Sequence, residues 1–192
     1  MSANSQERPT MMNCAMNMGA VLGLYYIGKF CLFPLSLHST MAAMLFLGLT
    51  LVVPFLVYRL VKYYRDRFLG GNIDFARAFV VALLVMAFGS LLASVAHYVY
   101  FAYIDGGAMV GVLEQGIEQL SSIDLSALEG VEDAESVATG LNSYIEMMRS
   151  TAARLRMMSP IDMTMGMLGN NVSWAFFVAL LTALLISVRR RK

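Results

Sequence analysis

The stretch KYYRDRFLGGNIDFARAF, from Lys62 to Phe79, lies between two long apolar runs and decides how both are interpreted. The basic residues around its Gly-Gly pair are Arg59, Lys62, Arg65, Arg67 and Arg77. The stretch has neither the GxxxxGK[ST] spacing of a phosphate-binding loop nor the GxGxxG of a dinucleotide site. Cations beside a membrane span mark its cytoplasmic side. We therefore interpret the stretch as a cytoplasmic turn, in which Gly70-Gly71 reverses the chain and Asp74 is the N-cap of the next helix.

The composition is that of an integral membrane protein. Hydrophobic residues make up 58% of the 192 residues and charged residues 14%, against about 45–50% and about 25% in soluble domains. The formal net charge is +1, which argues against a basic nucleic-acid-binding protein.

Four apolar runs predict an all-α membrane bundle with spans at about 15–35, 41–61, 75–104 and 172–188. Pro34 is expected to end the first span, and Pro54 to kink the second. Aromatic residues end the third run and begin the fourth, and we expect both groups to form one interfacial belt. They are Tyr98, Tyr100, Tyr103, Trp174, Phe176 and Phe177.

The basic segments predict the orientation. If the 59–77 stretch and the final RRRK are cytoplasmic, both termini lie inside and residues 105–169 lie outside. This loop is acidic, and apolar residues recur in it at helical spacing over 109–123 and 133–158. We predict two amphipathic helices, with a break at 124–130, that fold back over the bundle or lie on the outer membrane face.

Lys29 is the one charged residue inside a predicted span, and an ionisable group in a membrane is a functional hypothesis by default. His97 is expected at a similar depth in the outer half of the third span, so the two could form an intramembrane polar pair. The alternative is structural: Lys29 extends outward to the interface or to Asp105, and His97 is a packed helix residue.

Two further groups of residues are candidate contact sites. Arg59, Lys62, Arg65 and Arg67 could bind lipid phosphates, since each cation at a cytoplasmic surface attracts anionic headgroups by about 1 kcal/mol. Gly19 and Gly23 form a GxxxG motif that permits close helix approach, either within one bundle or in a homodimer.

Residue patterns of soluble enzymes and metal sites are absent from the sequence. Cys14 and Cys31 are seventeen positions apart on one expected helix, about 25 Å, which excludes a disulfide between them. No CxxC or HExxH occurs, and the sixteen methionines are better explained as adaptable apolar filler than as copper ligands. We expect no catalytic residue, metal or cofactor.

The central stretch resembles the domain of unknown function 4199 family, a bacterial family of four-span membrane proteins. The matching residues are Tyr64, Arg65, Asp66, Gly70, Gly71, Ile73, Phe75, Ala78 and Phe79. The first span and the closing span with its basic tail also look similar. The resemblance implies four-span topology and an inner-membrane location, and it implies no chemistry.

From these features we expect a non-enzymatic inner-membrane protein that acts through interaction or assembly. Its expected partners are the lipid bilayer and a second copy or another membrane protein, and not nucleic acid. The alternative is a small transporter or channel component that uses Lys29 and His97.

Overall fold

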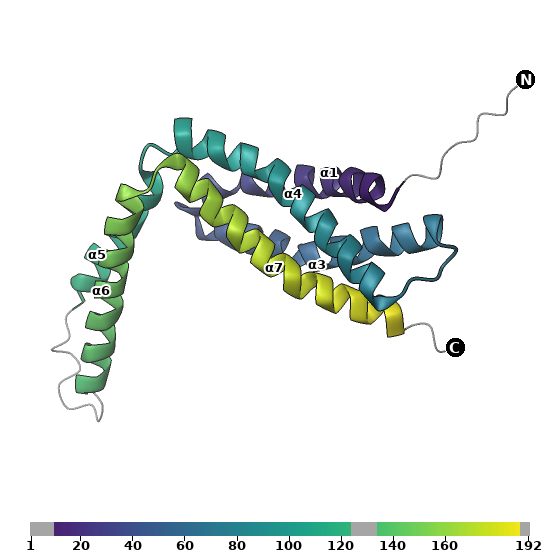
Figure 1. Cartoon of the computed structure of the whole chain (residues 1–192). Helices are drawn as coiled ribbons and strands as arrows, with labels where there is room; N and C mark the ends of the chain where they lie inside the picture. The colour runs from purple at the N-terminus through teal and green to yellow at the C-terminus, as the bar shows by residue number, and fades with distance from the viewer. Residues whose placement is uncertain (1–9, 124–133, 189–192) are drawn as a thin grey trace, which may run out of the picture. The chain divides into compact units, whose positions relative to one another are not determined.

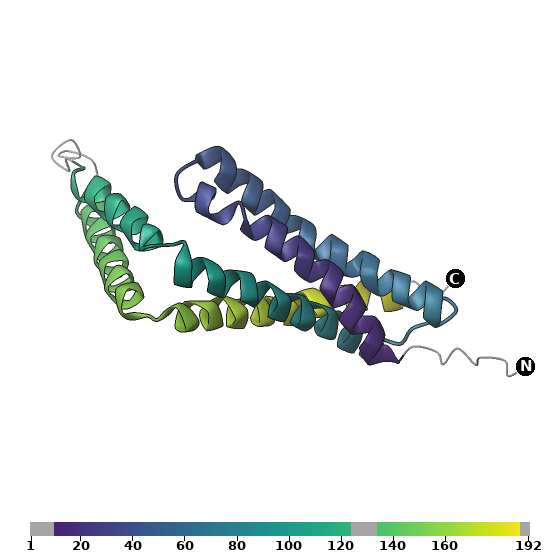
Figure 2. The same ribbon diagram turned by 90° about the horizontal axis from the view of Figure 1, so that it is seen from above.

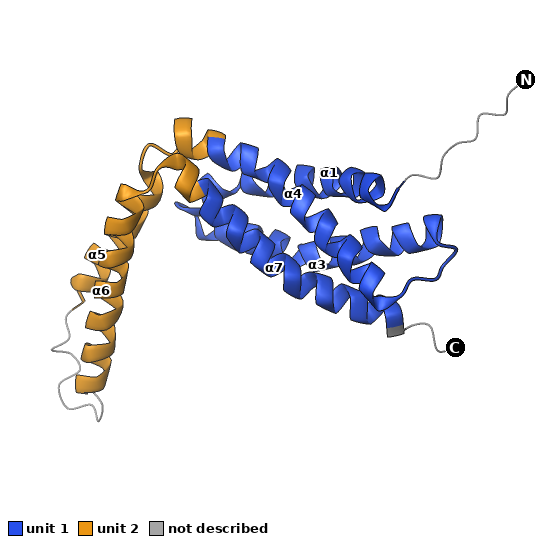
Figure 3. Cartoon of the chain, viewed as in Figure 1, with its two compact units in different colours: residues 1–98, 164–192 blue, residues 99–163 orange. Residues whose placement is uncertain are grey.

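The computed structural model of the chain describes residues 10–123 and 134–188 (Figure 1). Within these residues the regular elements are all helices: α1 Met11–Phe30, α2 Phe33–Ser36, α3 Thr40–Phe68, α4 Phe75–Tyr103, α5 Ala108–Ser121, α6 Ala134–Met157 and α7 Pro160–Val188. They form two compact units, coloured separately in Figure 3. Residues 1–98 with 164–192 make up unit 1, and residues 99–163 make up unit 2.

Four helical segments are long and apolar enough to cross a membrane: Met11–Ser36, Thr40–Phe68, Phe75–Tyr103 and Pro160–Ser187. The predicted all-α membrane bundle of four spans is therefore confirmed.

Two span boundaries differ from the prediction. α1 ends at Phe30, and Pro34 lies in the first turn of the short helix α2, where its missing N–H costs no hydrogen bond. α7 begins at Pro160 rather than near residue 172. The cause is a reciprocal cap: Ser159 Oγ accepts from the Asp162 N–H at 3.2 Å, and the Asp162 carboxylate accepts from the Ser159 N–H at 3.1 Å.

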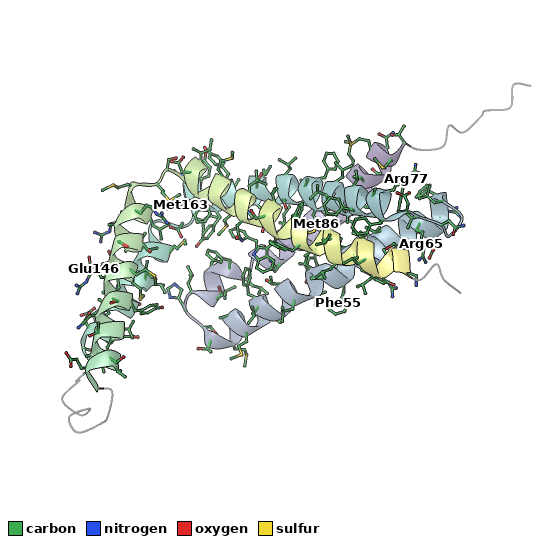
Figure 4. All side chains as sticks on the ribbon, turned by 60° about the horizontal axis from the view of Figure 1, so that its bottom comes forward. Phe55, Arg65, Arg77, Met86, Glu146 and Met163 are labelled. Atoms are coloured by element: carbon green, nitrogen blue, oxygen red, sulfur yellow. The ribbon has the colours of Figure 1, made fainter. Side chains whose placement is uncertain are left out.

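The core of unit 1 is made by narrow apolar stripes. On α3 the buried residues are Val53, Val57, Val61 and Tyr64, at the spacing of one helix face. Ala175, Ala179 and Ala183 are at most 1% exposed and form the buried face of α7. The rest of α3 is largely exposed; Phe55, labelled in Figure 4, is 72% exposed. Such outward apolar surface is expected where lipid, not water, surrounds a helix.

α1 and α3 run side by side in opposite directions (Figure 2). The start of α1, the turn between α3 and α4, and the end of α7 all lie at the same end of unit 1 (Figures 1 and 2). α7 leads into the RRRK sequence, which lies outside the described residues. This arrangement is the one the four-span prediction requires.

In unit 2, α5 and α6 pack against each other, so the two predicted loop helices are confirmed. Their interface contains Val110, Ile145 and Ala152, which are 8%, 6% and 4% exposed. Arg156 also pairs with Glu114 across the hairpin. The predicted break at 124–130 lies outside the described residues, and the position of the hairpin over the bundle or on the membrane stays a prediction.

The prediction of a single aromatic belt is wrong. The rings of Phe79 and Phe176 lie 5.4 Å apart. Phe79 is near the start of α4, and Tyr98 follows nineteen residues later, about 28 Å along the same helix. The Trp174–Phe177 group therefore lies well below the level of Tyr98, because α7 begins a dozen residues earlier than predicted.

Candidate functional site

The basic turn between α3 and α4 is a helix cap with two left-handed glycines. The Arg65 carbonyl accepts from the N–H groups of Leu69 and Gly71, both at 3.1 Å. Gly70 and Gly71 have φ of 61° and 85°, a region that strains any residue with a Cβ. The glycine pair therefore ends α3 and reverses the chain, as the sequence predicts.

Asp74 then starts α4. Its carboxylate accepts from the Arg77 N–H at 3.1 Å, and its carbonyl accepts from the Ala78 N–H at 3.0 Å. These are the contacts of an N-cap, so the predicted role of Asp74 is confirmed.

Apolar residues of the same stretch pack into the core of unit 1 and so hold the turn in place. Tyr64 is 3% exposed, Ile73 4% and Ala78 0%. The Phe79 ring lies edge-on to the Phe176 ring of α7. The residues that suggested the family resemblance are thus largely those that shape and anchor this turn.

The cations of the turn divide into two groups. Arg65 is held by its neighbour Asp66, with Nη2 and Nε each 2.8 Å from Oδ1, and its side chain is only 15% exposed. Arg59, Arg67 and Arg77 are exposed, and Lys62 is half-buried. Figure 4 shows Arg65 and Arg77 at the turn end of unit 1. Of the four predicted phosphate-binding residues, Arg59 and Arg67 are the freest to bind a headgroup.

Lys29 points to α3. Its Nζ lies 3.2 Å from Thr50 Oγ1, which itself donates to the Phe46 carbonyl at 2.8 Å. The ammonium also lies over the rings of Phe46 and Tyr26, at 4.9 and 5.6 Å from their centroids. The contacts described for Lys29 are thus with residues of α1 and α3. In unit 2, Asp105 accepts from the N–H groups of Gly107 and Met109.

His97 lies on α4 and is 5% exposed. Its ring packs at a centroid distance of 4.3 Å against Phe30, the residue after Lys29. Among the described residues its Nδ1 has no hydrogen-bond partner. Lys29 and His97 are close enough to interact electrostatically, but no described hydrogen bond joins them: one contacts α3, and the other contacts the Phe30 ring.

The GxxxG motif packs against α4 of the same chain. A Cβ placed on Gly19 would lie 2.5 Å from Phe88 Cβ, and one on Gly23 would lie 2.9 Å from Leu92 Cβ. Gly89 is the reciprocal contact on α4, 3.2 Å from the Gly19 carbonyl by the same measure. This face is therefore occupied within the bundle, in agreement with the first of the two predicted alternatives.

Two polar contacts of the structure were not expected from the sequence. The Tyr25 hydroxyl donates to the Leu49 carbonyl at 2.6 Å, in the α3 turn that precedes Pro54. Asp105 is 8% exposed and caps the start of α5, where it also interacts with Tyr100. The cap formed by Asp105 has a sequence signal, since an Asp followed by two glycines is a turn signature.

In the described ranges no cluster of three or more His, Cys, Asp or Glu side chains could hold a metal ion. Cys14 is buried and Cys31 is exposed, and neither forms a disulfide.

Comparison with known proteins agrees with this description. No curated protein and no solved structure matches the chain. A family model, described as a protein of unknown function (DUF4199), matches residues 17–187, from the first span to the end of the last. The chain therefore belongs to the DUF4199 family.

Proposed function

We propose that the chain is a non-enzymatic component of a bacterial inner-membrane assembly, which binds a partner protein through the α5–α6 hairpin. In this proposal both termini are cytoplasmic and the hairpin lies outside. The single observation that supports it best is an apolar band on α6 that the hairpin itself does not cover.

The band consists of Val137, Tyr144 and Met147, which are 51%, 49% and 55% exposed. They lie at i, i+7 and i+10, on a face next to the one that holds Ile145 and Ala152 in the hairpin interface. A helix exposed to water needs one apolar face to pack against its neighbour, and a second apolar face is typical of a surface that binds a partner.

The faces of small residues on α1 and α7 are the other candidate contact surfaces, and both are already occupied within the bundle. Gly19 and Gly23 of α1 pack on Gly89, and the alanines of α7 are buried in unit 1. Their close packing is thus used inside the bundle, which leaves the α6 band as the better contact surface.

The cytoplasmic placement of the turn rests on charge. Arg67 and Arg77 are exposed beside the turn between α3 and α4, at the end of unit 1 where α1 begins and α7 ends. Arg59 is exposed nine residues before the end of α3. An excess of Lys and Arg near the ends of spans favours the cytoplasmic side.

The experiment is photo-crosslinking from position 147 in intact cells. The expected result is one protein adduct of fixed mass, lost when Tyr144→Ser and Val137→Ser are combined. The matched control is a crosslinker at Asn142, an exposed residue on the side of α6 away from this band, which is expected to give no such adduct. Equal adducts from both positions, or none from position 147, would contradict the proposal.

The second candidate is a transporter or channel component that uses Lys29 and His97. The observation that favours it is the buried His97 Nδ1, which has no hydrogen-bond partner in the described part of the chain. Ionisable side chains inside a membrane are energetically costly and usually serve a function. Its test is proton and anion flux into vesicles containing the purified protein. Flux that His97→Phe abolishes would favour transport, and vesicles no leakier than protein-free ones would exclude it.

A further inference from the structure

Lys29 marks a place where the bundle is open on a face that is otherwise core. Thr50, its partner on α3, follows the spacing of the buried residues Val53 and Val57, which are 7% and 0% exposed. Thr50 itself is exposed, and Lys29 is half-buried. The core stripe of α3 therefore continues to Thr50, where it is left uncovered.

The position is deep in the membrane. Thr50 is ten residues from the start of α3, about 15 Å, and nine residues from Arg59, about 14 Å. Lys29 is seven residues before Ser36, where the first span ends, so it lies in the outer half of the membrane. The hydrocarbon core is about 30 Å thick, so the ammonium lies inside this core and not at its surface. A phospholipid headgroup stays at the interface and does not reach this depth without deforming the bilayer.

The described part of the chain has no acidic residue at this depth. In the described membrane-length helices the acidic residues are Asp66 and Asp162, and each lies in an end turn of its helix. Lys29 has a hydroxyl and two ring faces as partners, and these leave its positive charge without an anion. A lone charge in hydrocarbon is expensive, and such residues usually pair with an opposite charge.

We infer that the α1–α3 face around Lys29 and Thr50 binds a transmembrane helix of a partner protein, one that has an Asp or Glu in the outer half of its span. The carboxylate would accept from the N–H groups that Lys29 does not use on Thr50, and the helix would cover Thr50. Charge complementarity supports this occupant, because only a group fixed within the membrane meets Lys29 at its depth. The inference deepens the proposed assembly role by adding a second contact, within the bilayer.

The test places a photo-crosslinker at Leu47, 60% exposed and three residues before Thr50 in α3, in cells that express the full chain. The control position is Phe55, also exposed but on a different side of α3. We expect a protein adduct from position 47 only, with its crosslinked peptide in an apolar segment that contains Asp or Glu. Lys29→Met is expected to reduce the adduct roughly tenfold or more, since loss of one partner of a buried charge pair is strongly unfavourable. Lys29→Arg is expected to retain it.

A charge exchange completes the test. Lys29→Glu is expected to lose the adduct, and replacing the partner's acidic residue by Lys is expected to restore it. Lipid adducts alone, an adduct without an acidic residue, or full yield with Lys29→Met would each overturn the inference. Because the α6 band is tested from position 147, such a failure is distinguishable from failure of the hairpin contact.

Discussion

Gly19→Ala tests whether the contact between α1 and α4 holds the bundle together. The added Cβ would lie 2.5 Å from Phe88 Cβ and 3.0 Å from the Val85 carbonyl oxygen. Favourable carbon contacts lie at about 3.5–4.0 Å, so the two helices must separate locally by about 1 Å. Neither neighbour can rotate away easily, because one is a Cβ and the other is backbone.

The control is in the same helix. Gly28 has nothing within 4 Å of an added Cβ, so Gly28→Ala has only the helix-propensity effect, a gain of about 1 kcal/mol. Gly19→Ala has the same gain but adds an overpacking cost of about 1–3 kcal/mol. We therefore expect Gly19→Ala to be less stable than Gly28→Ala by about 1–3 kcal/mol.

The measurement is reversible unfolding of each variant by SDS in mixed micelles, followed by circular dichroism. Equal free energies of unfolding for the two variants would refute the close packing of Gly19 on Phe88. Greater stability of Gly19→Ala would refute it more strongly.

Three other predictions concern the turn and the hairpin. Gly71→Ala should lower the free energy of unfolding by about 1–2 kcal/mol, because Gly71 has a φ of 85° and the added Cβ would meet no neighbouring atom, so backbone strain is the only cost. The same SDS titration measures this change. An unchanged free energy of unfolding would mean that the left-handed turn is not formed. In the hairpin, Ile145→Ala should lower the stability of the α5–α6 packing by about 2–4 kcal/mol. Arg156→Ala removes an exposed ion pair and should lower it by less than about 1 kcal/mol. Hydrogen exchange of the α6 amides measures both effects, and a larger effect of Arg156→Ala would contradict the interface. The double variant Arg59→Gln, Arg67→Gln should bind anionic lipids less strongly relative to neutral lipids, by about 1 kcal/mol per charge, as measured by native mass spectrometry. Arg65→Gln should have a smaller effect, because the Arg65 side chain is already paired with Asp66. Equal effects per charge would contradict the separation of the cations into exposed and paired residues.

Much of the fold is predictable from the sequence because a membrane span is a simple signal. An uncharged run long enough to cross a bilayer is visible without any tertiary information, and Gly70-Gly71 with Asp74 is a strong local pattern. The start of α7 was missed because residues 160–171 contain Asp162, Asn170 and Asn171, which lower the hydropathy. The helix begins there nonetheless, since Ser159 and Asp162 cap it reciprocally.

The candidate sites were less predictable, because their geometry depends on which helix faces meet. Spacing alone placed Lys29 and His97 at similar depths, but it could not show that Lys29 turns to Thr50 while His97 meets Phe30. Likewise, the GxxxG motif showed that α1 can approach another helix closely, and only the structure identifies Gly89 of α4 as the contact.

The central claim, that the basic turn is cytoplasmic and the hairpin is external, is tested most directly by cysteine labelling. In a chain with Cys14 and Cys31 replaced by Ser, single cysteines are placed at Asn72 in the turn and at Ser143 on α6. In intact cells an impermeant maleimide is expected to label position 143 only, and after permeabilisation it should label both. Labelling of position 72 in intact cells, or protection of position 143, would contradict the account.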